Sequence, residues 1–311
     1  MLQHKHLIDI DEYSADEITE ILDTARSFKE VNDRAIKKLP TLRGRTIINL
    51  FLEPSTRTRT SFEIAGKRLS GDVINFSASS SSTTKGETLA DTAETLDAMN
   101  CDLIVVRSKQ EGAPRILTQH MDAHVVNGGD GKHQHPTQAL LDAFTIREMI
   151  GHIDGLKVGI VGDIAHSRVV GSLVPLLKIM GAEPIAIGPP TLMPARPDVL
   201  GARHSYTLDD ILPELDVVYM LRIQQERLES AALPSLREYA MLYGINLARM
   251  DAMKDDAIIM HPGPINRGVE LSADAADSDR AVILDQVNSG VAVRMAVMYL
   301  LLGGEGNGAA A

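Results

Sequence analysis

The sequence predicts an α/β protein of two open, doubly wound parallel-sheet domains joined by a short linker, with a C-terminal helix packing back on the first domain. Three observations support this fold class. Short apolar runs of strand length alternate with runs of helical periodicity, which implies parallel pairing with right-handed crossovers. The length of 311 residues suggests about two domains. Between the two series of strands, residues 151–155 form the expected linker.

The first domain is expected over residues 1–150. It opens with a helix over 14–30, where acidic residues follow Ser14 and apolar residues recur at helical spacing. Strands are expected at 46–52, 72–77, 102–107 and 123–127, and the helices that follow them at 55–69, 86–99, 112–121 and 136–150.

The second domain is expected over residues 151–288. Its strands are expected at 156–161, 184–187, 202–206, 216–221, 257–260 and 281–284, with helices between them. The apolar segment 291–302 is too short to span a bilayer and contains Arg294, so we expect a buried terminal helix over 289–303, capped by Ser289. In such sheets ligands bind outside the carboxyl ends of the strands, so motifs that follow strands are the most informative.

Composition limits the classes of function. The net charge of −11 and the pI near 5.4 argue against a nucleic-acid-binding surface, for which a basic stripe is expected. The single cysteine excludes an internal disulfide framework and is typical of a reducing cytoplasm. The first twelve residues have no long apolar core, so no signal peptide is expected. We therefore expect a cytoplasmic protein without nucleic-acid or membrane partners, in which any anion site is a local positive focus.

Residues 51–63 have the features of an oxyanion site. They join an apolar strand to a helix through Pro54, which suits a first turn whose N–H groups lack helical partners. Hydroxyl side chains and two arginines then gather where the helix dipole favours an anion. The alternative is an ordinary cap with surface arginines, and Arg59 fits it because Glu63 lies four residues on. Arg57 has no acid at that spacing, so we favour Arg57 as the anion ligand.

Three further features of the first domain follow strands. The serine-rich run over 77–88 contains Lys85 and is either a flexible linker or a mobile loop that closes over an anionic substrate. Arg107 ends an apolar strand, where an edge-strand charge is the simplest interpretation. A glycine-rich turn then delivers His135 and Gln138 to a helix start. His135 is either a cap or a donor to a carbonyl oxygen that gains charge in a reaction, and no metal-ligand pattern accompanies it.

The second domain has three comparable turns. Residues 159–169 suggest a dinucleotide site, but the G-x-G-x-x-G spacing is absent, so that interpretation is disfavoured. The same turn carries Arg168. Arg222 and Gln224 follow a later strand and lie together if the backbone there is extended. The turn Pro262-Gly263-Pro264 is either a tight loop or a source of carbonyl acceptors for an amide N–H₂ group.

Together these motifs resemble the carbamoyltransferases (transcarbamylases), in the expected order from near the N-terminus to the last helix. Ser55-Thr-Arg-Thr-Arg59 with His135-Pro-Thr-Gln138 is similar to the signature pair of that family. Three further motifs resemble the catalytic chain of the branch that uses aspartate: Lys85-Gly-Glu87, Arg222-Ile-Gln224 and His261-Pro-Gly-Pro264. The ornithine branch is the closest rival, but its His-Cys-Leu-Pro and Ser-Met-Gly patterns are not found in this sequence.

Charge also favours the aspartate branch. Arg168 and Arg222 supply two guanidinium forks for the two carboxylates of L-aspartate, whereas the side-chain amine of ornithine would call for an acid. The lone Cys101 is interpreted as core packing. The chain departs from the family pattern after Arg107, where Ser108-Lys109 replaces a frequent His-Pro. Ser81 and Ser82 are both candidates for the loop contact that precedes the lysine.

The resemblance implies transfer of the carbamoyl group of carbamoyl phosphate to the α-amine of L-aspartate, giving N-carbamoyl-L-aspartate and phosphate in de novo pyrimidine (UMP) biosynthesis. The implied catalytic residues are Arg57, Thr58, Arg107, His135 and Lys85. Those implied to bind carbamoyl phosphate are Ser55, Thr56, Arg57, Thr58, Arg107, His135, Gln138, Gly263 and Pro264. Those implied to bind aspartate are Lys85, Arg168, Arg222 and Gln224. Positioning and electrostatic stabilisation suffice, so neither metal nor organic cofactor is expected.

The resemblance also implies an assembly. In the family the serine-rich loop and its lysine come from a neighbouring subunit, so a homotrimer with shared active sites is expected. Regulatory chains and a dihydroorotase are further partners to be considered. The alternative functions are a carbamoyltransferase for another amine such as ornithine, and a non-enzymatic anion-binding module. Such a module would have no use for His135, Lys85 or the Arg222–Gln224 pair.

Overall fold

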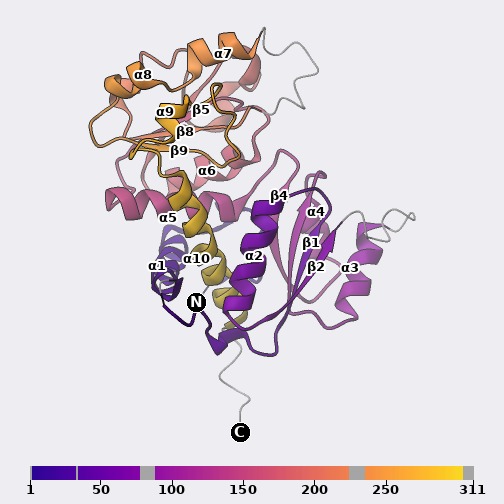
Figure 1. Ribbon diagram of the computed structural model, residues 1–311. Coiled ribbons are helices and arrows are strands. Elements are labelled where there is room, and N and C mark those ends of the chain that lie inside the picture. The colour runs from indigo at the N-terminus through magenta and orange to yellow at the C-terminus, as the bar shows by residue number, and fades with distance from the viewer. Residues whose placement is uncertain (1, 33, 78–87, 224–234, 304–311) are drawn as a thin grey trace. The chain divides into compact units, whose positions relative to one another are not determined.

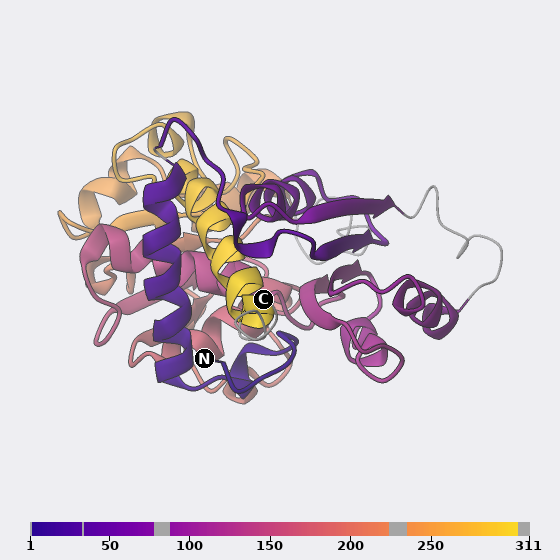
Figure 2. The same ribbon diagram turned by 90° about the horizontal axis from the view of Figure 1, so that it is seen from below.

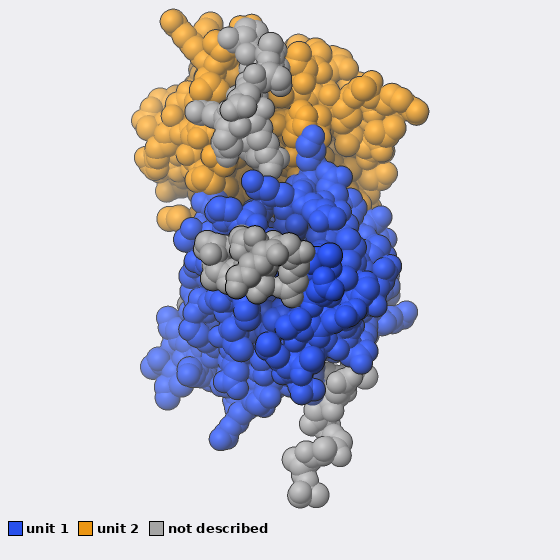
Figure 3. All heavy atoms as spheres, turned by 90° about the vertical axis from the view of Figure 1, so that its right-hand side faces the viewer, with its two compact units in different colours: residues 1–144, 288–311 blue, residues 145–287 orange. Residues whose placement is uncertain are grey.

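A computed structural model describes residues 2–32, 34–77, 88–223 and 235–303 of the chain (Figure 1). The chain divides into two compact units (Figure 3). Unit 1 contains residues 1–144 and 288–311, and unit 2 contains residues 145–287. Both sheets are parallel throughout, which confirms the predicted fold class. Among the described residues, no helix combines the length and the apolar character needed to cross a membrane.

Unit 1 is built on a four-stranded sheet with the order β2-β1-β3-β4. Its elements are α1 Ala15–Asn32, β1 Thr46–Phe51, α2 Thr56–Arg68, β2 Asp72–Ser77, α3 Leu89–Asp97, β3 Leu103–Ser108, α4 Ala113–Leu117, β4 His124–Asp130, the start of α5 Pro136–Ile150, and most of α10 Ile283–Leu302. The chain passes from β1 to β2 on one side and from β3 to β4 on the other. The topological switch point, where ligands bind in such sheets, therefore lies between β1 and β3.

The core of unit 1 covers both faces of its sheet. Residues 103–106 of β3 are fully buried and apolar, as expected of a central strand of a parallel sheet. Helices α1 and α10 lie side by side (Figures 1 and 2), and the rings of Phe28 and Tyr299 meet edge to face at 5.6 Å between centroids. Cys101 is buried in the same core, which confirms its predicted packing role.

Unit 2 is built on a five-stranded sheet with the order β7-β6-β5-β8-β9. Its elements are β5 Lys157–Val161, α6 Arg168–Ile179, β6 Glu183–Ile187, β7 Arg203–Ser205, β8 Val217–Met220, α7 Leu236–Tyr243, α8 Leu247–Ala252, β9 Ile258–Met260 and α9 Ala273–Ala276. The chain moves outward from β5 through β6 to β7, then returns to β8 and β9 on the other side. The switch point of this sheet therefore lies between β5 and β8.

The expectations for the end of the chain were wrong in two respects. Residues 281–284 do not form a strand: Ala281 makes an isolated bridge with Ile259, and α10 begins at Ile283. Ser289 lies inside this helix, so it is not the cap. The error arose because a run of four apolar residues does not distinguish a short strand from the start of a helix. Two other predicted helices, 86–99 and 112–121, proved shorter, at Leu89–Asp97 and Ala113–Leu117.

Candidate active site

The first turn of α2 stands at the β1/β3 switch point of unit 1. Ser55 occupies the N-cap in an extended conformation, and its side chain makes no capping hydrogen bond. Thr56 and Arg57 are exposed on this turn, whereas Thr58 is buried. The Ser55 hydroxyl thus leaves the first-turn N–H groups to other partners, and a helix mouth with these donors and an exposed arginine is suited to an oxyanion.

The local ion pair considered for this helix does not form. The carboxylate of Glu63 accepts hydrogen bonds from Lys67 at 2.5 Å and Asn75 at 2.9 Å, rather than from Arg59. The hydrogen bond from Lys67 is the largest cause that lowers the pKa of Glu63, and the charge of Arg59 adds only a weaker effect. Lys67 therefore takes the place that the sequence spacing had suggested for Arg59.

Arg107 is held in the centre of the sheet, so its interpretation as an edge-strand charge was wrong. Strand β3 lies between β1 and β4, and the Arg107 side chain is only 15% exposed. Its Nε donates to Glu53 at 2.8 Å, and one Nη1 donates to both the Thr58 hydroxyl and the Gly128 carbonyl at 3.3 Å. These contacts join the ends of three adjacent strands and aim the guanidinium at the first turn of α2.

A bulge at the end of β4 brings the next loop beside the end of β3. The register between β3 and β4 shifts after Val106, so that Ser108 faces Asp130. Gly129 and Gly131 within this stretch have φ values of 116° and 46°, which residues with a Cβ rarely adopt. The glycines noted in the sequence are thus required by the backbone path, which returns the chain toward β3 through a hydrogen bond from the Gly131 amide to the Ser108 carbonyl.

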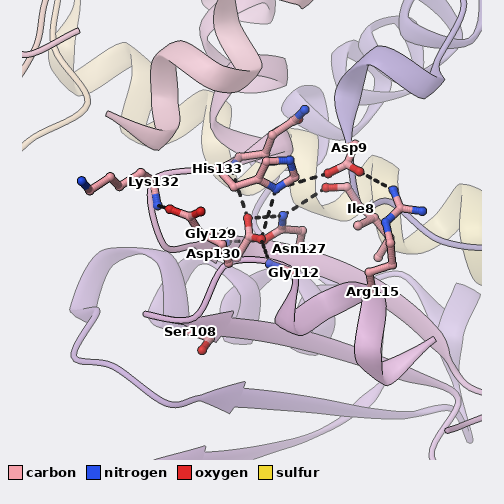
Figure 4. Close-up of polar contacts among 12 residues, drawn as sticks. Ile8, Asp9, Ser108, Gly112, Arg115, Asn127, Gly129, Asp130, Lys132 and His133 are labelled. Atoms are coloured by element: carbon pink, nitrogen blue, oxygen red, sulfur yellow. Dashed lines mark hydrogen bonds and ion pairs between the residues drawn. The ribbon is translucent and has the colours of Figure 1, made fainter. Parts of the chain in front are cut away.

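The buried carboxylate of Asp130 fixes this loop (Figure 4). It is 1% exposed and accepts hydrogen bonds from the Asn127 side chain at 2.9 Å and from the backbone amides of Gly112 at 2.8 Å and Gln134 at 3.1 Å. The His133 ring lies 3.1 Å from the same carboxylate. In the sequence Asp130 is one residue of a glycine-rich turn, and its place between Gly129 and Gly131 is the feature that marks it.

Around this centre, a second layer of ion pairs ties the loop to the N-terminal segment (Figure 4). Arg115 of α4 bonds Asp9, as Figure 4 shows, and it also bonds Glu12 at 2.8 Å. These two hydrogen bonds raise the pKa of Arg115 well above its usual value. The side chain of Gln134 accepts from the Ile10 amide at 2.8 Å. The loop between β4 and α5 is therefore held from two sides.

His135 and Gln138 follow this loop at the start of α5. His135 is 4% exposed and directly precedes the helix, and its carbonyl accepts from the Gln138 amide at 2.9 Å. The Gln138 side-chain nitrogen donates to Asp142, itself fully buried, at 3.0 Å. With its nitrogen engaged in this way, the Gln138 amide has its oxygen as the acceptor for a ligand N–H group.

Arg294 of α10 is a further cation in unit 1 that sequence analysis did not assign to the site. It is 4% exposed, its Nη1 donates to the Ser61 hydroxyl at 2.9 Å, and its guanidinium lies 5.0 Å from the centre of the Phe62 ring. Burial lowers the pKa of Arg294 to about 10, the charge of Asp142 opposes this shift, and the charge of Arg107 adds to it. Arg294 thus adds positive charge behind α2, close enough to interact with Arg107.

In unit 2, three of the predicted groups follow the carboxyl ends of neighbouring strands. Arg168 is the first residue of α6 after β5, Arg222 lies two residues beyond the end of β8, and Gly263-Pro264 follows β9. Because β5, β8 and β9 are neighbours with parallel directions, their carboxyl ends lie together. Both arginines are half-buried, and the Gly263–Pro264 peptide bond is cis.

The turn before Arg168 has its own internal contacts. The ring of His166 bonds the Asp163 carboxylate at 2.8 Å, and Ser167 occupies the N-cap of α6 without a side-chain capping bond. Lys85, Gln224 and the two loop serines, Ser81 and Ser82, lie outside the described residues. In the part of the chain that the structure describes, no group of three or more His, Cys, Asp or Glu side chains gathers as metal ligands.

Comparison with known proteins identifies the family. Residues 5–148 match the carbamoyl-phosphate-binding domain of the aspartate/ornithine carbamoyltransferases, and residues 154–301 match their aspartate/ornithine-binding domain. The chain belongs to the aspartate/ornithine carbamoyltransferase family. Its two domain matches together span nearly all of the described residues of this carbamoyltransferase chain.

Relatives within this family are aspartate carbamoyltransferases. The chain is 58% identical to the aspartate carbamoyltransferase catalytic subunit of Syntrophotalea carbinolica, covering 97% of this chain and 96% of the relative. It is 56% identical to that of Thermobifida fusca, covering 96% of each. Among solved structures, the catalytic subunit from M. jannaschii has a TM-score of 0.84 at 37% identity, covering 98% of this chain and 100% of that one. The Trypanosoma cruzi enzyme in complex with carbamoyl phosphate and aspartate has a TM-score of 0.85 at 34% identity, covering 94% and 95%.

Proposed function

We propose that this chain transfers the carbamoyl group of carbamoyl phosphate to the α-amine of L-aspartate, producing N-carbamoyl-L-aspartate and phosphate for pyrimidine biosynthesis. The observation that carries the proposal is the convergence at the β1/β3 switch point of unit 1. There the first turn of α2, the anchored guanidinium of Arg107 and the last part of β4 meet, in a chain whose relatives named above are aspartate carbamoyltransferases.

The phosphate of carbamoyl phosphate binds at the first turn of α2 in this proposal. Ser55, Thr56 and Thr58 supply hydroxyl and backbone donors, and Arg57 supplies an exposed charge. Arg107 already contacts the Thr58 hydroxyl, so its guanidinium needs little movement to reach the same anion. The Arg107–Glu53 bond means that the phosphate competes with a resident carboxylate for this guanidinium.

The carbamoyl group is oriented by residues of the neighbouring loops. His135, with Thr58 and Arg107, polarises the carbonyl oxygen, and the Gln138 oxygen accepts from the carbamoyl N–H₂ group. Gly263 and Pro264 in unit 2 supply carbonyl acceptors for the same group. These roles require hydrogen-bond donors and acceptors at fixed positions, which the Asp130 contacts provide for the loop that precedes His135.

Aspartate is bound in this scheme by Arg168, Arg222 and Gln224 of unit 2, together with Lys85. Its deprotonated α-amine attacks the carbonyl carbon, so that a C–N bond forms and the C=O electron pair moves to the oxygen. The oxyanion then returns its electron pair, the C–O bond to phosphate breaks, and phosphate leaves with those electrons. After the attack the nitrogen is positively charged and carries two hydrogens; one of these protons passes to the departing phosphate, which leaves the neutral carbamoyl nitrogen. Positioning and electrostatic stabilisation drive these steps.

We also propose a homotrimer with shared active sites, in a cytoplasmic protein. The support is the family of the chain together with the position of Lys85, which follows β2, a strand at the edge of the unit 1 sheet. An edge strand presents unpaired backbone groups that another chain can meet.

The reaction is tested by incubating the protein with carbamoyl phosphate and either L-aspartate or L-ornithine and measuring the carbamoylated product. Product with aspartate supports the proposal, whereas product with ornithine alone, or with neither, refutes it. In the same assay Arg57→Ala should lower kcat at least ~10²-fold, the scale of one lost oxyanion donor. Arg34→Ala removes an exposed arginine of the same unit and should leave kcat unchanged. Near-normal turnover of the Arg57→Ala variant would refute the proposal that Arg57 binds the phosphate.

A further inference from the structure

Unit 2 contains a fully buried carboxylate, that of Glu270, which has no role in the scheme above. It lies in the segment between β9 and α9, and its side chain is 0% exposed. A buried carboxylate is costly unless hydrogen bonds satisfy it, so its partners indicate what it holds in place. None of the sequence motifs described above includes this residue.

The first set of partners belongs to the segment after β8. Glu270 Oε1 accepts from the backbone amide of Ile223 at 2.8 Å. Ile223 is adjacent to Arg222 in the chain, and the Ile223 side chain is fully buried. The hydrogen bond from the Ile223 amide to Glu270 therefore fixes the peptide group that joins Arg222 to Ile223. It also fixes the direction in which the Arg222 side chain leaves the backbone.

The second set belongs to the loop that carries Gly263 and Pro264. Glu270 Oε2 accepts from the Asn266 amide at 2.6 Å, and Oε1 also accepts from the Asn266 side chain at 2.7 Å. The same Asn266 nitrogen donates to the Ile223 carbonyl at 2.9 Å. Glu270 and Asn266 thus bind both backbone polar groups of Ile223 and connect the two loops directly.

The base of this loop is also fixed. The His261 ring accepts from the Gly263 amide at 2.8 Å, and its other nitrogen lies 3.8 Å from Glu270 Oε2. Only one position separates Asn266 from Pro264, so a shift of Asn266 would be transmitted to the proline carbonyl. The carboxylate therefore sets the relative placement of two loops that the proposed function assigns to different substrates.

We infer that Glu270 is a positioning residue for the transfer reaction, which holds the Arg222 segment against the Gly263–Pro264 loop through the Ile223 and Asn266 amides. This inference rests on the proposed function, because Arg222 is there a ligand of aspartate and Pro264 a ligand of the carbamoyl group. Glu270 itself touches neither substrate in this scheme.

The test compares Glu270→Gln with the wild-type protein. An amide at this position has a single oxygen, so its N–H₂ group must face either the Asn266 amide or the Ile223 amide, both of which are donors. Losing one charge-assisted hydrogen bond of this kind should raise the KM for aspartate about tenfold or more. The Kd for inorganic phosphate, which binds in unit 1, should stay within about twofold of wild type. Glu183→Gln, at the opposite end of the unit 2 sheet, is the matched control.

Two further measurements keep the inference falsifiable if Glu270→Gln folds poorly. Asn266→Ala removes one donor and should also raise the KM for aspartate, and the double variant should be little worse than the more affected single variant, since both act on one network. Amide hydrogen exchange of the peptide containing Ile223 should accelerate in each variant, whether or not the protein is active. An unchanged KM for aspartate in both folded variants, or unchanged exchange at Ile223, would overturn the inference. Failure of the wild-type protein to carbamoylate aspartate would instead refute the proposed function, and the exchange result would stand separately.

Discussion

Replacing Asp130 with asparagine should destabilise unit 1 and impair turnover. The carboxylate accepts from the Asn127 side chain, the Gln134 amide and the Gly112 amide, with His133 as a fourth neighbour. An asparagine has one side-chain oxygen, which would still accept hydrogen bonds from the Asn127 side chain and the Gln134 amide. Its N–H₂ group would then face the Gly112 amide, another donor.

The magnitude follows from this geometry. One buried amide loses its charged acceptor, and a buried donor left without a partner costs about 1–3 kcal/mol, with the weakened bonds to Asn127 and Gln134 adding to it. We expect a loss of about 2–4 kcal/mol in the free energy of unfolding. At about 2–4 °C per kcal/mol for a domain of this size, the melting temperature of unit 1 should fall by roughly 4–16 °C.

Differential scanning calorimetry of the whole chain measures this change. Asp122→Asn, a substitution of an exposed residue of the same unit, should change the melting temperature by less than about 2 °C. In the folded Asp130→Asn variant at low temperature, kcat should fall because the loop leading to His135 is no longer fixed. A melting temperature equal to that of the Asp122→Asn control would refute the reasoning about the carboxylate.

Two other predictions concern acid stability and assembly. Burial, the largest cause, together with Lys5 and His124, lowers the pKa of His6 to about 4, and its Nδ1 accepts from the Val125 amide. The unfolded chain therefore binds this proton first, so the stability it confers is complete above about pH 6.5 and is lost as pH falls towards 4. Because His6 is only half-buried, solvent screening should reduce the effect to a loss of about 1–2 kcal/mol. His6→Asn should abolish this part of the pH dependence of urea unfolding, and an unchanged slope in that variant would count against the assignment to His6. For assembly, Lys85→Ala and Arg57→Ala chains, each inactive alone, should regain partial activity when mixed if active sites are shared, and no recovery in verified hybrids would argue against sharing.

The parts of the site that the sequence predicted are those set by local rules. Strands β1, β3 and β4 were expected within a few residues of their observed bounds, so the residues that follow them could be placed at one edge of a parallel sheet. The N-cap at Ser55 and the glycine turn before His135 follow from backbone requirements that each stretch of sequence shows by itself. The family motifs lie in these same turns, at the carboxyl ends of parallel strands, where ligands bind in sheets of this kind.

What the sequence could not predict depends on contacts between distant positions. Glu53 and Arg107 are 54 positions apart, and Arg294 and Ser61 are 233 positions apart. Arg107 was misinterpreted for this reason. The sequence shows only an arginine at the end of an apolar run, and it does not show that β1 and β4 flank this strand on both sides. The false strand at 281–284 is a local ambiguity that one distant contact resolves: Ala281 alone bridges to Ile259, and the helix α10 begins two residues later.

Two of the buried carboxylates, those of Asp130 and Glu270, show why a motif identifies a site more readily than it reveals what holds the site rigid. Asp130 and Glu270 bind mainly backbone amides: those of Gly112 and Gln134 in one unit, and those of Ile223 and Asn266 in the other. A backbone amide is present at every residue except proline, so such a bond requires no particular side chain at its donor and leaves no pattern in the sequence. Each carboxylate is nevertheless buried, and its removal would leave buried amide donors without an acceptor. Such unpaired donors lower the free energy of unfolding. The geometry of the proposed substrate-binding groups in each unit is therefore tied to a residue whose importance appears only when its amide partners are known.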